Sequence, residues 1–92
     1  MSNTRPNILV LMTDQQRFDT VSAYGINPIC RTPHIDNLAQ RGVRFENAFT
    51  PTAICSPARA SFYTGLYPHK HGVTANGLTL REGVRGINHY FP

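Results

Sequence analysis

The sequence predicts an α/β fold in which a mostly parallel central sheet is flanked by helices. A continuous apolar run at residues 7–13 is typical of a strand buried on both faces of such a sheet. Residues 43–49 alternate apolar and polar side chains, as a half-buried strand does. Residues 32–42 and 56–65 carry the start and stop signals of helices. We therefore expect two strands and two helices in this chain.

The first expected strand ends at Asp14 and Gln15. Open α/β sheets bind their ligands at the carboxyl ends of strands, so a metal-binding carboxylate would be well sited at Asp14. The alternative is that Asp14 begins a loop or caps a short helix. Residues 17–31 show no sustained period and predict a loop with a short helical turn at most. Within that loop, Cys30 is expected to be a small buried apolar group.

Residues 32–42 have the features of one complete helix. Thr32 is the expected N-cap, Pro33 occupies the first helical position and Gly42 follows the end. The early acidic residue Asp36 is explained by the helix dipole, and His34 by a place on the surface, so neither is interpreted as a metal ligand. The expected buried face consists of three apolar residues, Ile35, Leu38 and Ala39.

The second expected strand leads the chain to Cys55. After it, Ser56 is the predicted N-cap of a helix, Pro57 takes the first helical position, and Gly65 closes the helix. Cys55 would then lie immediately before a helix N-terminus. Such an end presents unpaired N–H groups and partial positive charge, which stabilise an anionic nucleophile and an anionic substrate alike.

Arg59 falls about one turn into the same helix. From that position its planar guanidinium can reach back to hold the oxygens of the nucleophile or a ligand carboxylate. Lysine, whose ammonium is a point charge, would be a poor substitute. Cys55 and Arg59 are therefore the candidate catalytic residues.

Composition and charge exclude several classes of function. The net charge of +4 comes from scattered basic residues without a cluster that could follow a phosphate backbone, so nucleic-acid binding is not expected. No apolar run approaches the roughly 20 residues that a membrane span needs. The start of the chain lacks a signal-peptide core, which favours the cytoplasm and reduced cysteines. Nothing in the sequence indicates an oligomeric state.

The remaining histidines and the C-terminal part give weaker signals. His69 and His71 flank Lys70 in a stretch bounded by proline and glycine, and they are expected to shape a loop and not to bind a metal or an anion. No ligand spacing typical of zinc is present. Residues 74–92 predict a loop or a weak strand.

The core Cys55-Ser56-Pro57-Ala58-Arg59 and its context resemble the N-terminal part of sulfatases. Four further segments resemble the family in the correct order, so that the resemblance spans roughly residues 5 to 73. These segments are residues 5–15, 32–39, 42–45 and 64–73. The resemblance implies an alkaline-phosphatase-like α/β domain, of which residues 1–92 would form an incomplete N-terminal segment.

The resemblance also implies a divalent metal ion, usually calcium, at the carboxyl edge of the sheet. Asp14 matches the first metal-binding aspartate of the family, and Cys55, once modified, would be a further ligand. Many sulfatases continue with a second aspartate, whereas this chain has Gln15, which can coordinate through its amide oxygen but brings no charge. Calcium and manganese both remain open.

The implied activity is hydrolysis of a small sulfate ester. In the family, a formylglycine-generating enzyme oxidises the cysteine that Cys55 matches to an aldehyde, formylglycine. One hydroxyl of its hydrate attacks sulfur, and the other drives the release of sulfate. An aspartate followed by glutamine also occurs in the branch with phosphonate monoester hydrolases, so phosphonate monoesters and phosphodiesters are alternative substrates. A truncated product without activity is the other alternative, and we expect the isolated chain to be inactive.

Overall fold

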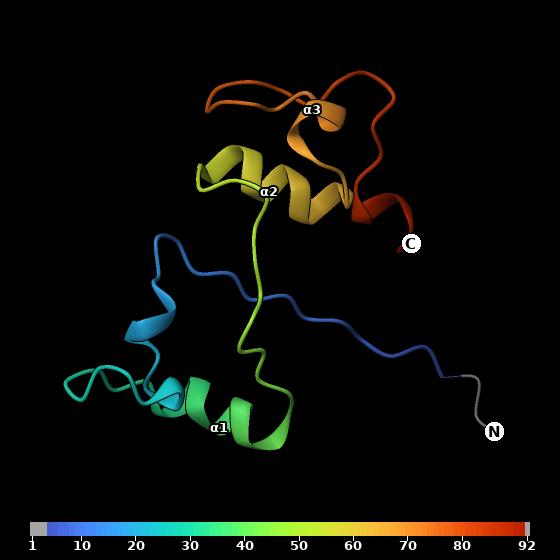
Figure 1. The fold of residues 1–92 in the computed structure, drawn as a ribbon. Coiled ribbons are helices and arrows are strands. Elements are labelled where there is room, and N and C mark those ends of the chain that lie inside the picture. The colour runs from blue at the N-terminus through green and yellow to red at the C-terminus, as the bar shows by residue number, and fades with distance from the viewer. Residues whose placement is uncertain (1–3, 92) are drawn as a thin grey trace. The chain divides into compact units, whose positions relative to one another are not determined.

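The computed structural model describes residues 4–91, which belong to two compact units. Unit 1 is Met1–Phe45 and unit 2 is Glu46–Pro92 (Figure 1). Unit 1 contains the short 3-10 helices η1 (Phe18–Thr20) and η2 (Ser22–Tyr24) and the helix α1 (Pro33–Arg41). Unit 2 contains α2 (Cys55–Thr64), α3 (Pro68–His71) and the 3-10 helix η3 (Ile87–His89). None of the described helices is long and apolar enough to cross a bilayer.

Helix α1 has the predicted bounds. Thr32 is its N-cap residue and Gly42 its C-cap residue, but the Thr32 side chain makes no hydrogen bond to a helix N–H. The predicted buried face is wrong, because Ile35 is 38% exposed, Leu38 is 55% exposed and Ala39 is only partly buried. A helix with one small neighbouring element has little surface against which to bury an apolar face.

A hydrogen-bond network joins η2 to α1 and explains Asp36. The backbone N–H groups of Ser22 and Thr32 each donate to the hydroxyl of the other, at 2.9 and 2.8 Å. The Ser22 hydroxyl donates to Asp36 Oδ2 at 2.6 Å, and the Thr32 hydroxyl donates to Asp36 Oδ1 at 2.9 Å. The hydrogen bond from Ser22 contributes most to holding the pKa of Asp36 below its ordinary value, and the bond from Thr32 adds to this effect. Both bonds favour the carboxylate.

The predicted sheet is not confirmed. Residues 4–91 contain no strand, and both 7–13 and 43–49 are without regular structure (Figure 1). The apolar side chains of 8–12 are exposed, with Leu9 at 81%. A strand is stable only where a neighbouring strand takes its backbone hydrogen bonds and another layer covers its side chains. No described residue supplies either to these two runs.

The small core of unit 2 lies between α2 and the chain that follows it. Pro57, His71 and Val73 are buried there. The predicted end of α2 is confirmed, since the N–H of Gly65 donates to the carbonyl of Ser61 at 2.8 Å. After α3, the described residues of the tail form coil, turns and η3, which agrees with the predicted loop and leaves the predicted weak strand unformed.

Candidate active site

Cys55 is the first residue of α2 and not the residue before it. The backbone of Ile54 is extended, with φ −90° and ψ 137°, and its carbonyl accepts the N–H of Ala58 at 3.0 Å. Ile54 is therefore the N-cap, and the predicted N-cap Ser56 is already helical. Pro57 falls at the third helical position, where a missing N–H still costs no intrahelical hydrogen bond. The thiol of Cys55 is free and the residue is exposed.

The first turn of α2 offers fewer free donors than the sequence suggested. The N–H of Ser56 donates to the side-chain oxygen Oδ1 of Asn76 at 3.0 Å. Pro57 has no N–H, and the N–H of Ala58 belongs to the first helical bond. An anion at this helix end would therefore find few backbone N–H groups that still lack a hydrogen-bond partner. Asn76 was not among the predicted site residues.

Arg59 lies on the same face of α2 as Cys55, because residues four apart in a helix are neighbours. The rise between them is about 6 Å, which is within the reach of an arginine side chain. Arg59 is exposed. The catalytic roles of Cys55 and Arg59 stay predictions. The helix places both residues on one face, where the predicted roles need them.

The predicted metal ligands belong to different units. Asp14 and Gln15 lie in a bend of unit 1, directly after the apolar run, whereas Cys55 lies in unit 2. Gln15 has a φ of 53°, in the left-handed region. Within residues 4–91, no three histidine, cysteine, aspartate or glutamate side chains come together as a metal site. The carboxylate and amide oxygens of Asp14 and Gln15 do fit a hard cation such as calcium. Their joint coordination with Cys55 remains a prediction.

His71 has a structural role that the sequence did not reveal. The stretch predicted as a loop is the short helix α3, and the His71 side chain at its end is completely buried. Its Nδ1 accepts the N–H of Val73 at 3.0 Å, and its Nε2 lies 3.0 Å from Ser61 Oγ. His69 is exposed and stacks on Tyr67 with ring centroids 6.0 Å apart. The expectation that these histidines shape the chain after α2 fits this arrangement.

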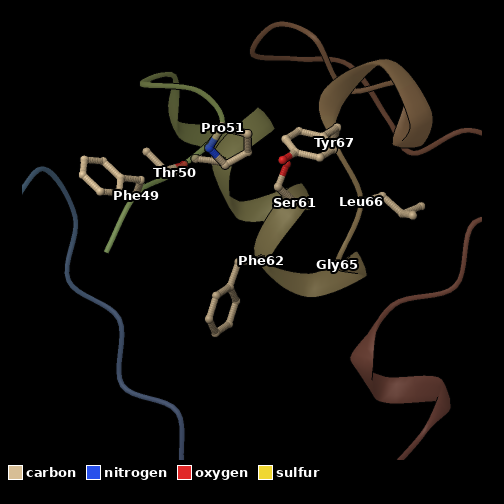
Figure 2. Close-up of a pocket in the computed structure, with 9 residues that line it drawn as sticks. Phe49, Thr50, Pro51, Ser61, Phe62, Gly65, Leu66 and Tyr67 are labelled. Carbon is tan, nitrogen blue, oxygen red and sulfur yellow. The ribbon is translucent and has the colours of Figure 1, made fainter. Parts of the chain in front are cut away.

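An open groove of about 540 Å³ lies beside α2, toward the end of the helix that is closed by Gly65. Its lining is mainly apolar and includes Phe49, Pro51, Phe62 and Leu66. Figure 2 shows the lining side chains, among which Ser61 and Phe62 leave α2 in different directions. Neither Cys55 nor Arg59 lines this groove, so it is separate from the candidate nucleophile.

Curated relatives match this chain over most of its length. It is 38% identical over 87 residues to the uncharacterized sulfatase YidJ of Escherichia coli K12, covering 95% of this chain and 17% of that protein. It is 41% identical over 76 residues to an N-acetylglucosamine-6-O-sulfatase of Bacteroides thetaiotaomicron, covering 83% of this chain and 13% of the relative. It is 40% identical over 83 residues to the multifunctional alkaline phosphatase superfamily protein PehA of Trinickia caryophylli, covering 86% of this chain and 16% of that protein.

These relatives are far longer than the segment that matches them, because the chain spans less than a fifth of the length of each. No solved structure gives a significant match. The family profile described as Sulfatase matches residues 6–92, which is nearly the whole chain. The profile and the relatives agree with the resemblance carried by the segment around Cys55. The chain belongs to the sulfatase family.

Proposed function

We propose that the protein to which this segment contributes is a sulfuric ester hydrolase whose nucleophile derives from Cys55. The observation that carries the proposal is the placement of Cys55 at the exposed start of α2, with Arg59 one turn further on. The family of the chain and the relatives named as sulfatases support the same reaction. Residues 1–92 would be the N-terminal part of the catalytic domain.

Each of the candidate residues has a distinct task in this proposal. Cys55 is the site of conversion to formylglycine, whose hydrate supplies an oxygen nucleophile and a second hydroxyl that allows sulfate to leave. Arg59 orients the oxygens of the nucleophile through its fixed pair of N–H donors. Asp14 and Gln15 would hold a divalent cation, calcium or manganese, which supplies positive charge against the sulfate oxygens.

Phosphonate monoesters and phosphodiesters are a second class of candidate substrate. Two observations favour them: glutamine at position 15, where many sulfatases have a second aspartate, and the similarity to a relative described as multifunctional. Like sulfate monoesters, phosphonate monoesters and phosphodiesters carry a single negative charge, so one cation site can serve all three classes of ester.

A formylglycine-generating enzyme would convert Cys55, with an external oxidant, and the substrate would be a small ester. We place the protein in the cytoplasm and expect it to bind neither nucleic acid nor a membrane. The 92-residue chain alone should not hydrolyse substrate. Incubation of the chain with an aryl sulfate and calcium would check this expectation.

The direct test is the mass of the tryptic peptide at residues 45–59 from the complete protein, produced together with a formylglycine-generating enzyme. We expect the aldehyde or its hydrate at Cys55. The tryptic peptide at residues 18–31 provides the matched control, because it carries Cys30, the other free thiol, which should remain a thiol. An unmodified Cys55 under these conditions would contradict the proposal. Rates with sulfate monoesters, phosphonate monoesters and phosphodiesters would then identify the ester.

A further inference from the structure

Asn76 takes the place of a missing helix cap beside Cys55. The residue at the N-cap position of α2 is Ile54, whose side chain has no polar atom to accept a helix N–H. The acceptor comes instead from Asn76, twenty residues further along the chain than Ser56, whose N–H donates to Asn76 Oδ1 at 3.0 Å. Because a backbone N–H can only donate, the contacting atom of Asn76 must be its oxygen.

This hydrogen bond acts on the peptide group that follows the nucleophile. The N–H of Ser56 belongs to the same planar unit as the carbonyl of Cys55. Holding that N–H therefore fixes the backbone torsion ψ of Cys55, and with it the direction from which the side chain leaves the helix. An unheld first turn frays readily, since its N–H groups have no intrahelical partner.

The segment that carries Asn76 is itself attached to α2. At its base, the N–H of Arg81 donates to the carbonyl of His71 at 2.8 Å, which brings the two ends of the segment together. His71 in turn is bonded to Val73 and lies 3.0 Å from Ser61 Oγ of α2. The segment 71–81 thus contacts α2 at two points, through His71 at Ser61 and through Asn76 at Ser56. We call this arrangement the α2 clamp.

A simpler interpretation is that Asn76 serves only its own turn. Asparagine before glycine is common in turns, where its side chain bonds to backbone two residues on. Here the side-chain oxygen bonds to Ser56, in another element. The contact therefore serves α2.

We propose that Asn76 is a positioning residue for the nucleophile formed at Cys55, an inference that rests on the proposed hydrolase function. It acts through Ser56 by fixing the first peptide of α2. It also occupies the Ser56 N–H, so the sulfate group must be held by other donors. Its contribution should be felt in the chemical step more than in substrate affinity, because its hydrogen bond holds the peptide group of the attacking residue.

The test uses the complete protein with Asn76→Ala and Asn76→Asp, with rates divided by the fraction of Cys55 converted. We expect Asn76→Ala to lower kcat about tenfold, the effect of a lost cap, with KM nearly unchanged. Asn76→Asp retains an oxygen for Ser56 and should restore kcat to within about threefold. Its added charge should raise KM, because it repels the ester equally in the ground and transition states.

A matched control is Thr52→Ala, which removes a hydroxyl that accepts the N–H of Ile54 at 3.3 Å without touching Ser56. This variant should have a kcat per converted Cys55 within about twofold of that of the unsubstituted protein. Unchanged kcat in Asn76→Ala, or an equal loss in the Ala and Asp variants, would overturn the proposal.

A second readout is independent of turnover. Protection of the Ser56 amide against hydrogen exchange, measured in unconverted protein, should fall about tenfold in Asn76→Ala and persist in Asn76→Asp. Unaltered protection in Asn76→Ala would overturn the positioning role whatever the substrate is. If the parent protein is fully converted yet hydrolyses none of the esters, the proposed function fails, and the exchange result alone decides whether Asn76 positions Cys55.

Discussion

The Nε2 atom of His71 lies 3.0 Å from the hydroxyl oxygen of Ser61, in the buried part of unit 2. The other ring nitrogen, Nδ1, accepts the N–H of Val73. A neutral imidazole that accepts at Nδ1 carries its hydrogen on Nε2, so His71 donates to Ser61. One side chain therefore joins α2, α3 and the chain after α3, and both of its polar atoms are used.

We expect His71→Leu to destabilise unit 2. Leucine leaves the Ser61 hydroxyl and the Val73 N–H buried without this partner, which costs about 1–3 kcal/mol for each group that water cannot reach. The free energy of unfolding in urea measures the effect. The control is His69→Leu, at an exposed position in the same short helix, which should change stability by less than about 0.5 kcal/mol. Equal effects at both positions would show that the buried hydrogen bonds contribute nothing.

Unit 1 should lose stability in acid through Asp36. Its pKa is lowered in the folded chain, first by the Ser22 hydroxyl, and returns to about 4 on unfolding. The contribution of the carboxylate is therefore fully present above about pH 4 and is lost as the pH falls through the lower, folded pKa. Asp36→Asn should remove this acid-dependent part of the unfolding profile, because an amide presents a donor to two hydroxyl donors. An NMR titration of the carboxyl carbons reads the pKa directly.

Asp19 provides the control for Asp36. It pairs with Arg17 at 2.7 Å, but the Arg17 side chain is 78% exposed, and such surface pairs contribute little. We expect Asp19→Asn to leave the acid-dependent part of the unfolding profile intact. If Asp19→Asn flattened the profile as much as Asp36→Asn, general surface charge would explain the acid sensitivity better than the network does.

Gly72 should tolerate alanine less well than Gly83 does. Both have positive φ, 87° and 81°, so a side chain is strained at either position. A Cβ at Gly72 would also lie 3.3 Å from the Cβ of Arg81, while nothing lies within 4 Å of one at Gly83. Gly72→Ala should therefore cost more than the roughly 1 kcal/mol expected for Gly83→Ala, as thermal unfolding would show. Equal costs would mean that Arg81 moves aside freely.

Gln15 allows a test of the proposed cation site. We expect Gln15→Asp to tighten calcium binding in the complete protein by about tenfold, because it adds a charged oxygen ligand. Gln15→Asn is the control for the backbone, since asparagine and aspartate both tolerate the left-handed conformation that residue 15 adopts at φ 53°. Calorimetric titration with calcium measures both. Tighter binding in the Asn variant as well would assign the gain to relief of backbone strain.

Cys55→Ser should abolish turnover in the complete protein. Serine has one hydroxyl and cannot form the hydrate that the proposed reaction needs. Cys30→Ser, which changes the other free thiol, should retain most of the activity. Arg59→Lys should lower kcat at least tenfold, because an ammonium cannot replace two fixed donors. Turnover by Cys55→Ser near that of the parent protein would be incompatible with the formylglycine mechanism.

The sequence predicted the two longer helices because their signals are local. Proline near the start and glycine after the end bracket both α1 and α2 within about ten residues. The start of α2 was misplaced by two residues because serine followed by proline is the commoner start. Ile54 is the N-cap here, since Asn76 supplies the acceptor from elsewhere.

The strands and the clamp depend on partners that no local pattern reveals. Residues 7–13 have the composition of a central strand, but a sheet needs neighbours, and the relatives are more than five times as long as the matched segment. His71 has no signal of its own, since burial by Ser61 and Val73 decides its role. Asn76 lies in the stretch predicted as a loop or weak strand, and nothing in that pattern indicated its contact with Ser56.

The α2 clamp also bears on the order in which the protein folds. Its contacts join residues at most twenty positions apart, from Ser56 to Asn76. Loops of that length close in well under a millisecond, whereas pairing a central strand with distant ones is slow. The apolar run 8–12, predicted as a strand, needs such partners, but the segment around Cys55 does not. The nucleophile segment can thus take the shape described here before any pairing of the predicted strands.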